Sequence, residues 1–386
     1  MQLKYNILKM YLLKGVVWFM LAMPIIVLFF QEHGLTLTEI MLLQSIYSLS
    51  VAFFEIPSGY MADLFGRKHT IVISTFFSFM GYLVFSFYDG FYMFAFAQIL
   101  VGIGGSLMSG SDSALLYDTL LELKMKKSYT SVEGKSYAVG NFSEATAGIL
   151  GGFLAVSSIY LPIYVQTSIL FLSIPIALSL VEPKMCKGMK IDRSINTFLG
   201  VVRFAILESK KIRWLIIYSS AMGVATLMMA WFAQPFFKEI EIPLAYYGIL
   251  WAALNYSAGV TSYNAHKISC STNSLLFIIS IIMLMSFFFI GSNISLFGLL
   301  FIFIIYFLRG IITPILRNEI NINTTSDKRA TILSIRSFLI RISFAIIAPL
   351  IGYFAENESL SLSFYILGVL VGFVSLMSAY KFSRLD

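Results

Sequence analysis

The sequence predicts an all-α integral membrane protein with twelve transmembrane helices, arranged as two six-helix bundles with both termini in the cytoplasm. Charged residues make up 12% of the chain, whereas a typical soluble protein has about 25%. Apolar stretches of about 20 residues, long enough to cross a bilayer as a helix, recur along all 386 residues. Basic residues gather in alternate connections between these stretches. These observations favour a multi-pass membrane protein over two soluble domains.

The spans are read from hydropathy and from the turn residues between them. The first apolar stretch has a basic lead-in, but it is too long for a signal peptide and has no small-x-small exit, so we expect it to remain in the protein. The second begins after Thr36 and Glu39, which have the spacing of a capping box. In chain order the predicted spans are 10–30, 37–60, 70–88, 91–117, 136–157, 160–181, 212–237, 244–265, 273–290, 294–316, 331–354 and 360–380.

The charges between the spans give their orientation. With the N-terminus in the cytoplasm, the outer connections carry Lys238 and several acids, and the inner connections receive most of the basic residues. This is the positive-inside pattern of membrane proteins. The formal net charge of +7 therefore reflects membrane topology, and we expect no nucleic-acid partner.

Several classes of site lack a pattern in the sequence. The three histidines are scattered and have no metal-ligand spacing, and no phosphate-binding Gly-rich loop of the Walker type is present. Cys186 and Cys270 both fall in predicted inner connections, where a structural disulfide is not expected. No histidine cluster or nucleophile–base set occurs. We therefore expect no catalytic residues, no metal, no cofactor and no enzyme activity.

The longest inner connection divides the chain into two halves of six spans each. The predicted domains are an N-terminal bundle (1–181), a cytoplasmic linker (182–211) and a C-terminal bundle (212–386). Apolar residues at helical spacing in the linker, from Ile195 to Ile206, indicate an amphipathic helix on the membrane surface or a linker helix packed on the bundle. A faint echo of the segment from Gly59 to Arg67 at Gly259 to Lys267 favours two related halves.

A charged turn separates the second and third predicted spans. Its sequence, "GYMADLFGRKH", fits the pattern G-x-x-x-D-x-x-G-R-K. Gly59 and Gly66 allow close approach and a tight turn. Asp63 can accept hydrogen bonds from Arg67 or from a neighbouring helix N-terminus.

This turn resembles the signature loop of the major facilitator superfamily, a family of transporters. The twelve spans and the central linker extend the resemblance to the whole chain. The resemblance implies a conformational latch formed by Gly59, Asp63, Gly66, Arg67 and Lys68. The alternative is that Arg67 and Lys68 only enforce topology. The phrases "EIPSGYMAD", "SGSDSALLYD" and "DKRATILSIRS" resemble a bacterial drug- or metabolite-efflux branch.

Two departures from the family pattern weaken the implied proton antiport. Antiporters of this family often carry R-x-x-x-G-x-G in span four, where this chain has Gln98 in place of arginine. Their span-five motif contains G-P-x-x-G-G, where this chain has Gly148 in place of proline.

Ionisable residues inside spans are costly and indicate function by default. The acids lie in the first half and the bases in the second, on faces that several of them share with small residues. We expect pairs across the two halves that act as an inner gate, with Asp112 and Glu144 as proton carriers. A static set of ion pairs, within each half or between them, is the alternative. The candidates are Glu55, Asp112, Glu144, Arg309, Arg336 and Arg341.

In the superfamily, spans one, four, seven and ten line a central cavity. By that resemblance the candidate cavity residues are Trp18, Gln98, Tyr218, Met222 and Tyr306, together with Arg309. Polar and aromatic side chains suit amphipathic organic molecules. Helix packing is the alternative role for each aromatic residue.

The leading prediction is a monomeric secondary active transporter that exports small organic molecules across the bacterial inner membrane by alternating access, coupled to protons. Its partners are then the small-molecule substrate, protons and the lipid bilayer. One alternative is an importer or symporter of a metabolite or a metal-chelate complex. Another is a membrane sensor or assembly factor that keeps the fold without transport.

Overall fold

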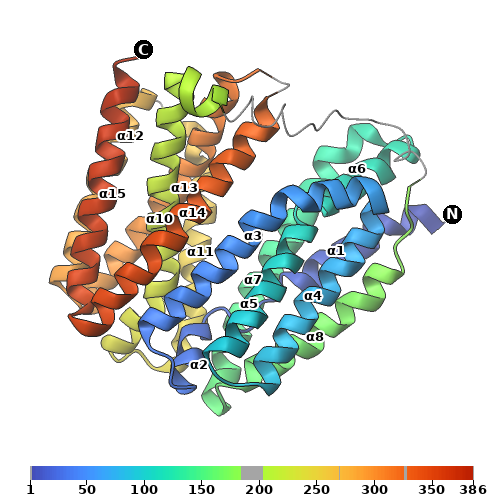
Figure 1. Ribbon diagram of the computed structural model, residues 1–386, viewed down its shortest axis with the longest axis horizontal. Coiled ribbons are helices and arrows are strands. Elements are labelled where there is room, and N and C mark those ends of the chain that lie inside the picture. Colours follow the sequence, from blue (N-terminus) through green and yellow to red (C-terminus); the bar gives the residue numbers. More distant parts are fainter. Residues whose placement is uncertain (1, 184–202, 269, 326–327, 386) are drawn as a thin grey trace. The chain divides into compact units, whose positions relative to one another are not determined.

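The computed structural model describes residues 2–183, 203–268, 270–325 and 328–385. Within these ranges all regular structure is helical, which confirms the predicted all-α class (Figure 1). In this part of the chain, nine helical segments are long and apolar enough to cross a membrane, and they match nine of the predicted spans. The predicted spans 10–30, 136–157 and 244–265 correspond to helices that are interrupted or more polar. The count of twelve spans therefore stays a prediction.

The helices of the first half are connected by short turns (Figure 1). They are η1 (Gln2–Tyr5), α1 (Asn6–Val17), α2 (Ile26–Glu32), α3 (Leu37–Phe65), α4 (Arg67–Phe87), α5 (Phe91–Met108), α6 (Ser111–Glu122), η2 (Lys126–Ser128), α7 (Tyr129–Ser157) and α8 (Leu161–Leu178).

The helices of the second half follow the linker. They are η4 (Phe204–Glu208), α10 (Lys210–Glu239), η5 (Leu244–Tyr246), α11 (Tyr247–Asn264), η6 (Ala265–Lys267), α12 (Thr272–Ser292), α13 (Leu296–Ile322), α14 (Arg329–Asn357) and α15 (Leu360–Ser383). The predicted amphipathic helix falls mainly on residues 184–202, outside the described ranges, as does Cys186. Cys270 is exposed and forms no disulfide.

Contacts divide the chain into two compact units. Unit 1 comprises Met1–Leu35, Ile46–Lys190 and Pro243–Ala252, and unit 2 comprises Thr36–Ser45, Ile191–Ile242 and Ala253–Asp386. The units therefore follow the two halves except for two short exchanged segments, at the start of α3 and at the start of α11. The domain boundaries predicted from the sequence stay predictions.

In unit 1, α4 packs against both α5 and α8, and α1 packs against α6, α7 and α8. Small residues bring α4 and α5 close together. A Cβ atom on Gly104 would lie 2.9 Å from the backbone oxygen of Ser74, and the Ser74 hydroxyl donates a hydrogen bond to the Gly104 carbonyl at 2.6 Å. Such contacts hold helices together in lipid, where burial of apolar surface gives little drive.

In unit 2, α12 packs against α13 and α15, and α10 packs against α13, α14 and α15. The start of α3 also belongs to this unit. Thr36 and Glu39 form the predicted capping box, because the Thr36 amide donates to Glu39 Oε2 at 2.9 Å and the Glu39 amide donates to the Thr36 hydroxyl at 3.3 Å. The amide of Thr38 donates to Glu356 Oε2 of α14 at 3.1 Å.

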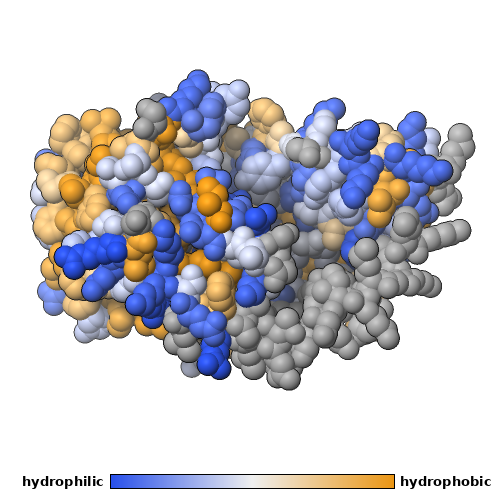
Figure 2. Space-filling view, turned by 90° about the horizontal axis from the view of Figure 1, so that it is seen from above, coloured by the Kyte–Doolittle hydropathy of each residue, from blue (hydrophilic) through white to orange (hydrophobic). Residues whose placement is uncertain are grey.

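Large apolar side chains project outward from the spanning helices of both units. Phe171 of α8, Ile346 of α14 and Phe373 of α15 are among those that are more than half exposed. A soluble protein rarely exposes so many large apolar side chains, whereas a helix in lipid does so by necessity. Figure 2 looks onto the helix ends uppermost in Figure 1 and shows hydrophilic residues gathered there.

Candidate functional site

The first predicted span is interrupted near its middle. α1 ends at Val17 and α2 begins at Ile26, with turns between them. Pro24, near the end of these turns, lacks an amide hydrogen and disfavours helical geometry in the residue before it, which opposes a continuous helix through this segment. The buried side chain of Gln166, on α8, accepts a hydrogen bond from the Leu21 amide at 2.6 Å. The non-helical backbone between α1 and α2 is therefore hydrogen-bonded by a polar side chain of the same unit.

An ion pair lies beside this interruption, within unit 1. Lys14 Nζ of α1 is 2.7 Å from Asp112 Oδ2 of α6, and their side chains are 18% and 14% exposed. Asp112 stands in the first turn of α6, where the helix dipole favours a carboxylate. Its Oδ1 atom accepts a hydrogen bond from the Ser113 amide at 2.8 Å. For Asp112, the structure thus gives a partner within its own half.

Two aromatic rings adjoin the ion pair. The Lys14 ammonium lies 4.9 Å from the centroid of the Trp18 ring, within range of a cation–π interaction. The rings of Trp18 and Tyr137 meet edge to face, 5.8 Å apart. Gly140 leaves room for the indole, because a Cβ there would lie 3.0 Å from the Trp18 ring.

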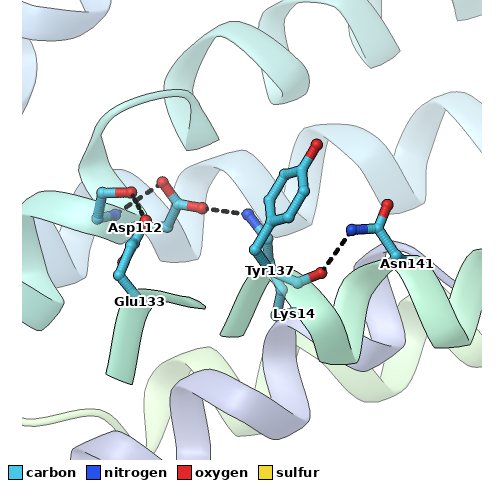
Figure 3. A network of polar contacts seen from close by, with 6 residues as sticks. Lys14, Asp112, Glu133, Tyr137 and Asn141 are labelled. Atoms are coloured by element: carbon cyan, nitrogen blue, oxygen red, sulfur yellow. Dashed lines mark hydrogen bonds and ion pairs between the residues drawn. The ribbon is translucent and has the colours of Figure 1, made fainter. Parts of the chain in front are cut away.

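One face of α7 carries polar groups toward the same place. Glu133, Tyr137 and Asn141 follow at intervals of four residues and so share a face. The Ser113 hydroxyl donates to Glu133 Oε1 at 2.5 Å. Glu133 is therefore joined to Asp112 through Ser113, the next residue in the chain. Figure 3 shows Lys14 reaching Asp112, with Tyr137 and Asn141 on successive turns of α7. We call Lys14, Trp18, Asp112, Glu133 and Tyr137 the α1–α7 site.

The electrostatic effect of the two acids is visible at Tyr129, which begins α7 and precedes the predicted span. Burial raises the pKa of the Tyr129 hydroxyl, and the nearby charges of Glu133 and Asp112 raise it further. The carboxylates therefore make this end of the site electronegative.

The charged turn of the sequence motif lies at the start of α4, also in unit 1. Gly66 has a φ angle of +90°, which favours glycine. The Arg67 and Lys68 amides donate to the two carboxylate oxygens of Glu182, at 2.8 and 2.6 Å. The Arg67 side chain forms an ion pair with the buried Asp118 and donates to a carbonyl oxygen of α6. Glu182 thus accepts hydrogen bonds at this helix N-terminus, and Asp118 pairs with Arg67.

The chain that leaves α8 is held to the beginning of the protein as well. Asn6 is fully buried, accepts a hydrogen bond from the Val181 amide at 3.0 Å and donates one to the Val181 carbonyl at 2.7 Å. Its side-chain amide also donates to the Thr119 hydroxyl at 3.2 Å. Residues 181 and 182 are therefore tied to α1 and α4, and Asn6 and Arg67 in turn join these helices to α6.

The other members of the predicted latch cannot be compared so directly. Gly59 and Asp63 lie within α3, and the Asp63 side chain is outside the described part of the chain. The latch between conformations stays a prediction. Within the described residues, the contacts of Gly66, Arg67 and Lys68 join the start of α4 to other parts of unit 1.

The remaining predicted charges are dispersed over several helices. Glu55 on α3, Glu144 on α7 and Arg341 on α14 are half-buried. Arg309 of α13 is exposed, and its guanidinium lies 5.7 Å from the Tyr306 ring centroid. Their gate and proton-carrier roles stay predictions.

Arg336 of α14 is half-buried, and its Nε atom is buried without a hydrogen-bond partner in the described residues. Its predicted place in the inner gate also stays a prediction.

The predicted cavity residues divide into two groups. Trp18 belongs to the α1–α7 site. Gln98 is buried in α5, and Tyr218, Met222 and Tyr306 are almost fully buried within unit 2. The Tyr218 hydroxyl donates to the Leu276 carbonyl at 2.9 Å. These contacts suit helix packing, the alternative role that the sequence offered, and the cavity assignment stays a prediction.

Several residues of the site were not singled out from the sequence. Lys14 lies in the basic stretch that opens the first span, and neither Glu133 nor Tyr137 belongs to a motif of the sequence. The spacing of Glu133, Tyr137, Asn141 and Glu144 along one face of an otherwise apolar segment is the signal that would have found them. No comparable local signal marks Glu182, because a carboxylate at the end of a span is common.

Comparison with known proteins identifies the family of this chain. The sequence profile of the Major Facilitator Superfamily matches residues 10–324. A Bacillus subtilis (strain 168) protein described as an uncharacterized MFS-type transporter, YxaM, is 23% identical over 244 residues. That alignment covers 61% of this chain and 59% of the relative, so the match spans about three-fifths of the relative's length.

Solved structures share the fold at low identity. The nucleoside transporter NupG superposes with a TM-score of 0.77 at 13% identity, over 100% of this chain and 98% of that one. A bacterial homologue of the human lysosomal transporter Spinster has a TM-score of 0.76 at 13% identity, over 99% and 98%. A D-xylose–proton symporter has a TM-score of 0.72 at 12% identity, over 97% and 96%. With the all-helical fold and the profile match across most of its length, this chain belongs to the Major Facilitator Superfamily.

Proposed function

We propose that this protein is a secondary active transporter that exports small organic molecules across the bacterial cytoplasmic membrane by alternating access, coupled to protons. The observation that carries the proposal is the Lys14–Asp112 pair, with 2.7 Å between Nζ and Oδ2, set beside an interrupted span and two aromatic rings. Charges at this depth are costly to keep and mark substrate or ion pathways in membrane proteins. Family membership and the transporter names of the structural neighbours support the same function.

The ion pair offers a route to coupling. In the pair, the Asp112 carboxylate neutralises the Lys14 ammonium, and each charge is satisfied. A proton on Asp112 removes the attraction and releases Lys14, which changes the charge of the site by one unit. A conformational cycle that exposes Asp112 alternately to the two sides of the membrane would then couple proton movement to substrate movement.

Export is favoured by the efflux-like phrases of the sequence. Import is the competing function, and the D-xylose–proton symporter among the structural neighbours favours it. A sensor or assembly factor on the same fold would keep the helices without moving a substrate. The two transport directions predict opposite changes in the distribution of a small molecule between cell and medium.

The test compares small molecules inside and outside expressing cells by mass spectrometry. Cells carry the native protein, Asp112→Asn, or Glu358→Gln, which alters an exposed carboxylate beyond the end of α14. Export predicts a compound that is enriched outside with the native protein and with Glu358→Gln, and that is lost with Asp112→Asn. The same compound enriched inside would replace export by import. Identical profiles in all three strains, at equal membrane expression, would count against transport and favour the sensor function.

A further inference from the structure

The positive charge in the α1–α7 site is carried by a side chain of the protein itself, Lys14. The Lys14 ammonium lies 2.7 Å from Asp112 Oδ2 and 4.9 Å from the Trp18 ring centroid. A carboxylate on one side and an aromatic face on the other are the groups that recognise organic ammonium ions. We propose that the substrate of this protein is an organic cation, an amine with an aromatic or other apolar body, whose charged group takes the place that the Lys14 ammonium occupies in this structure.

The proposal rests on the proposed transport function only in calling the bound molecule a substrate. The binding site itself is argued from contacts inside unit 1. All five residues of the α1–α7 site lie in that unit.

The charge of the site favours a cation over an anion. Asp112 and Glu133 are linked through Ser113, whose amide donates to Asp112 and whose hydroxyl donates to Glu133. The site thus contains two carboxylates, joined through Ser113, and one ammonium. An anion would need Lys14 as its partner and would meet both carboxylates at close range, whereas a cation would meet a site that is negative once Lys14 withdraws.

Lys14 is suited to withdraw. An ammonium on a four-carbon stem is a compact, mobile charge, whereas a guanidinium would be fixed by paired hydrogen bonds. Among the described residues, the Lys14 ammonium donates a hydrogen bond to Asp112 alone. The side chain therefore balances the charge of the site and can move aside when another cation arrives.

The aromatic pair has an exposed side that an apolar body could contact. Tyr137 is 60% exposed although its ring packs on Trp18. Asn141, one turn further along α7, is also exposed and donates to the Tyr137 carbonyl at 2.9 Å. A polar, exposed helix face within a predicted span is suited to line a water-filled path, because lipid would not solvate it. Figure 3 shows the Tyr137 ring projecting from α7 beside the ion pair.

Equilibrium binding to the purified full-length protein in detergent tests the proposal without transport. The probes are benzyltrimethylammonium, benzoate and benzyl alcohol, which present a similar ring with positive, negative and no charge. Titration calorimetry at pH 8 measures each affinity. Lys14→Met removes the competing ammonium, Lys14→Arg keeps a positive charge, and Lys4→Met makes the same change at an exposed position in η1.

We expect Lys14→Met to bind benzyltrimethylammonium at least tenfold more tightly than the native protein does, because no internal cation competes. Lys14→Arg should bind the cation more weakly than native, because a fixed guanidinium still occupies the site, and Lys4→Met should stay within threefold of native. Adding Asp112→Asn to Lys14→Met should abolish the gain. Benzoate binding that disappears in Lys14→Met would overturn the proposal, and so would the absence of cation binding in both the native protein and Lys14→Met.

A second variant covers the case in which Lys14→Met does not fold. Trp18→Leu removes the aromatic face and leaves the ion pair, so cation binding should weaken at least fivefold, while Trp18→Phe should retain most of it. Equal affinities in the two variants would refute the role of the ring. Binding that fails while cells still move a compound would reject this inference alone, and binding that succeeds without any transport would reject only the proposed function.

Discussion

Replacing Glu182 by glutamine removes one of the two carboxylate oxygens that hold the start of α4. In the native protein, Oε1 accepts from the Arg67 amide at 2.8 Å and Oε2 accepts from the Lys68 amide at 2.6 Å. Glutamine has nearly the same shape, but it offers one oxygen and turns an N–H group toward the second amide. One hydrogen bond is lost, and the negative charge at the helix N-terminus is lost with it.

The cost follows from these two losses. A hydrogen bond to a charged group contributes about 1.5–3 kcal/mol, and a carboxylate at a helix N-terminus adds roughly 0.3–1 kcal/mol. Glu182 is half-buried, so we take a value near the lower end of the sum of these two contributions. The free energy of opening the first turn of α4 should therefore fall by about 2 kcal/mol. This corresponds to roughly a 30-fold larger opening constant.

Hydrogen exchange at the Arg67 and Lys68 amides measures this opening. When reclosing is fast, the exchange rate scales with the opening constant. We expect at least one of the two amides to exchange roughly 30-fold faster in Glu182→Gln, with no such change in Glu358→Gln. Exchange within threefold of native at both amides would show that the Glu182 carboxylate does not stabilise the start of α4.

Two further predictions concern α7 and its neighbours. Glu144→Gln should flatten the pH dependence of transport, because it removes a half-buried carboxylate from the polar face of α7; an unaltered pH profile would eliminate Glu144 as a required proton carrier. Gly248→Ala should lower the free energy of unfolding by about 1–3 kcal/mol, because its Cβ would lie 2.1 Å from the Gly148 carbonyl oxygen. Gly259→Ala is the matched control on α11, since its Cβ meets no atom within 4 Å. Equal unfolding midpoints for the two alanine variants in detergent would contradict the close packing.

The sequence was most informative where one local pattern decides the structure. Hydropathy located nine of the spanning helices, and the spacing of Thr36 and Glu39 located a capping box that the hydrogen bonds confirm. The glycine before Arg67 marked a turn, and the structure places Gly66 at a positive φ angle there. Each of these features depends on residues only a few positions apart.

Pairings between distant residues were beyond the reach of local patterns. Lys14 and Asp112 are 98 positions apart, and no local pattern in the sequence links them. The interruption of the first span was missed because its apolar content is continuous, although Pro24 marks the place. Glu182 and Asp118, which contact Arg67 in the structure, could not be distinguished by sequence from other carboxylates near the inner surface.

The tie between Asn6 and Val181 has a consequence for how the protein is made. The two residues are separated by 175 positions. Arg67 and its acceptor Glu182 are separated by 115 positions. At a synthesis rate of about 5–20 residues per second, Asn6 leaves the ribosome roughly 9–35 s before its partner. During that interval the buried amide of Asn6 and the first turn of α4 lack their final acceptors. These contacts of α1 and α4 can therefore form only when the end of α8 emerges, which places residues 181 and 182 late in the assembly of the first six spans.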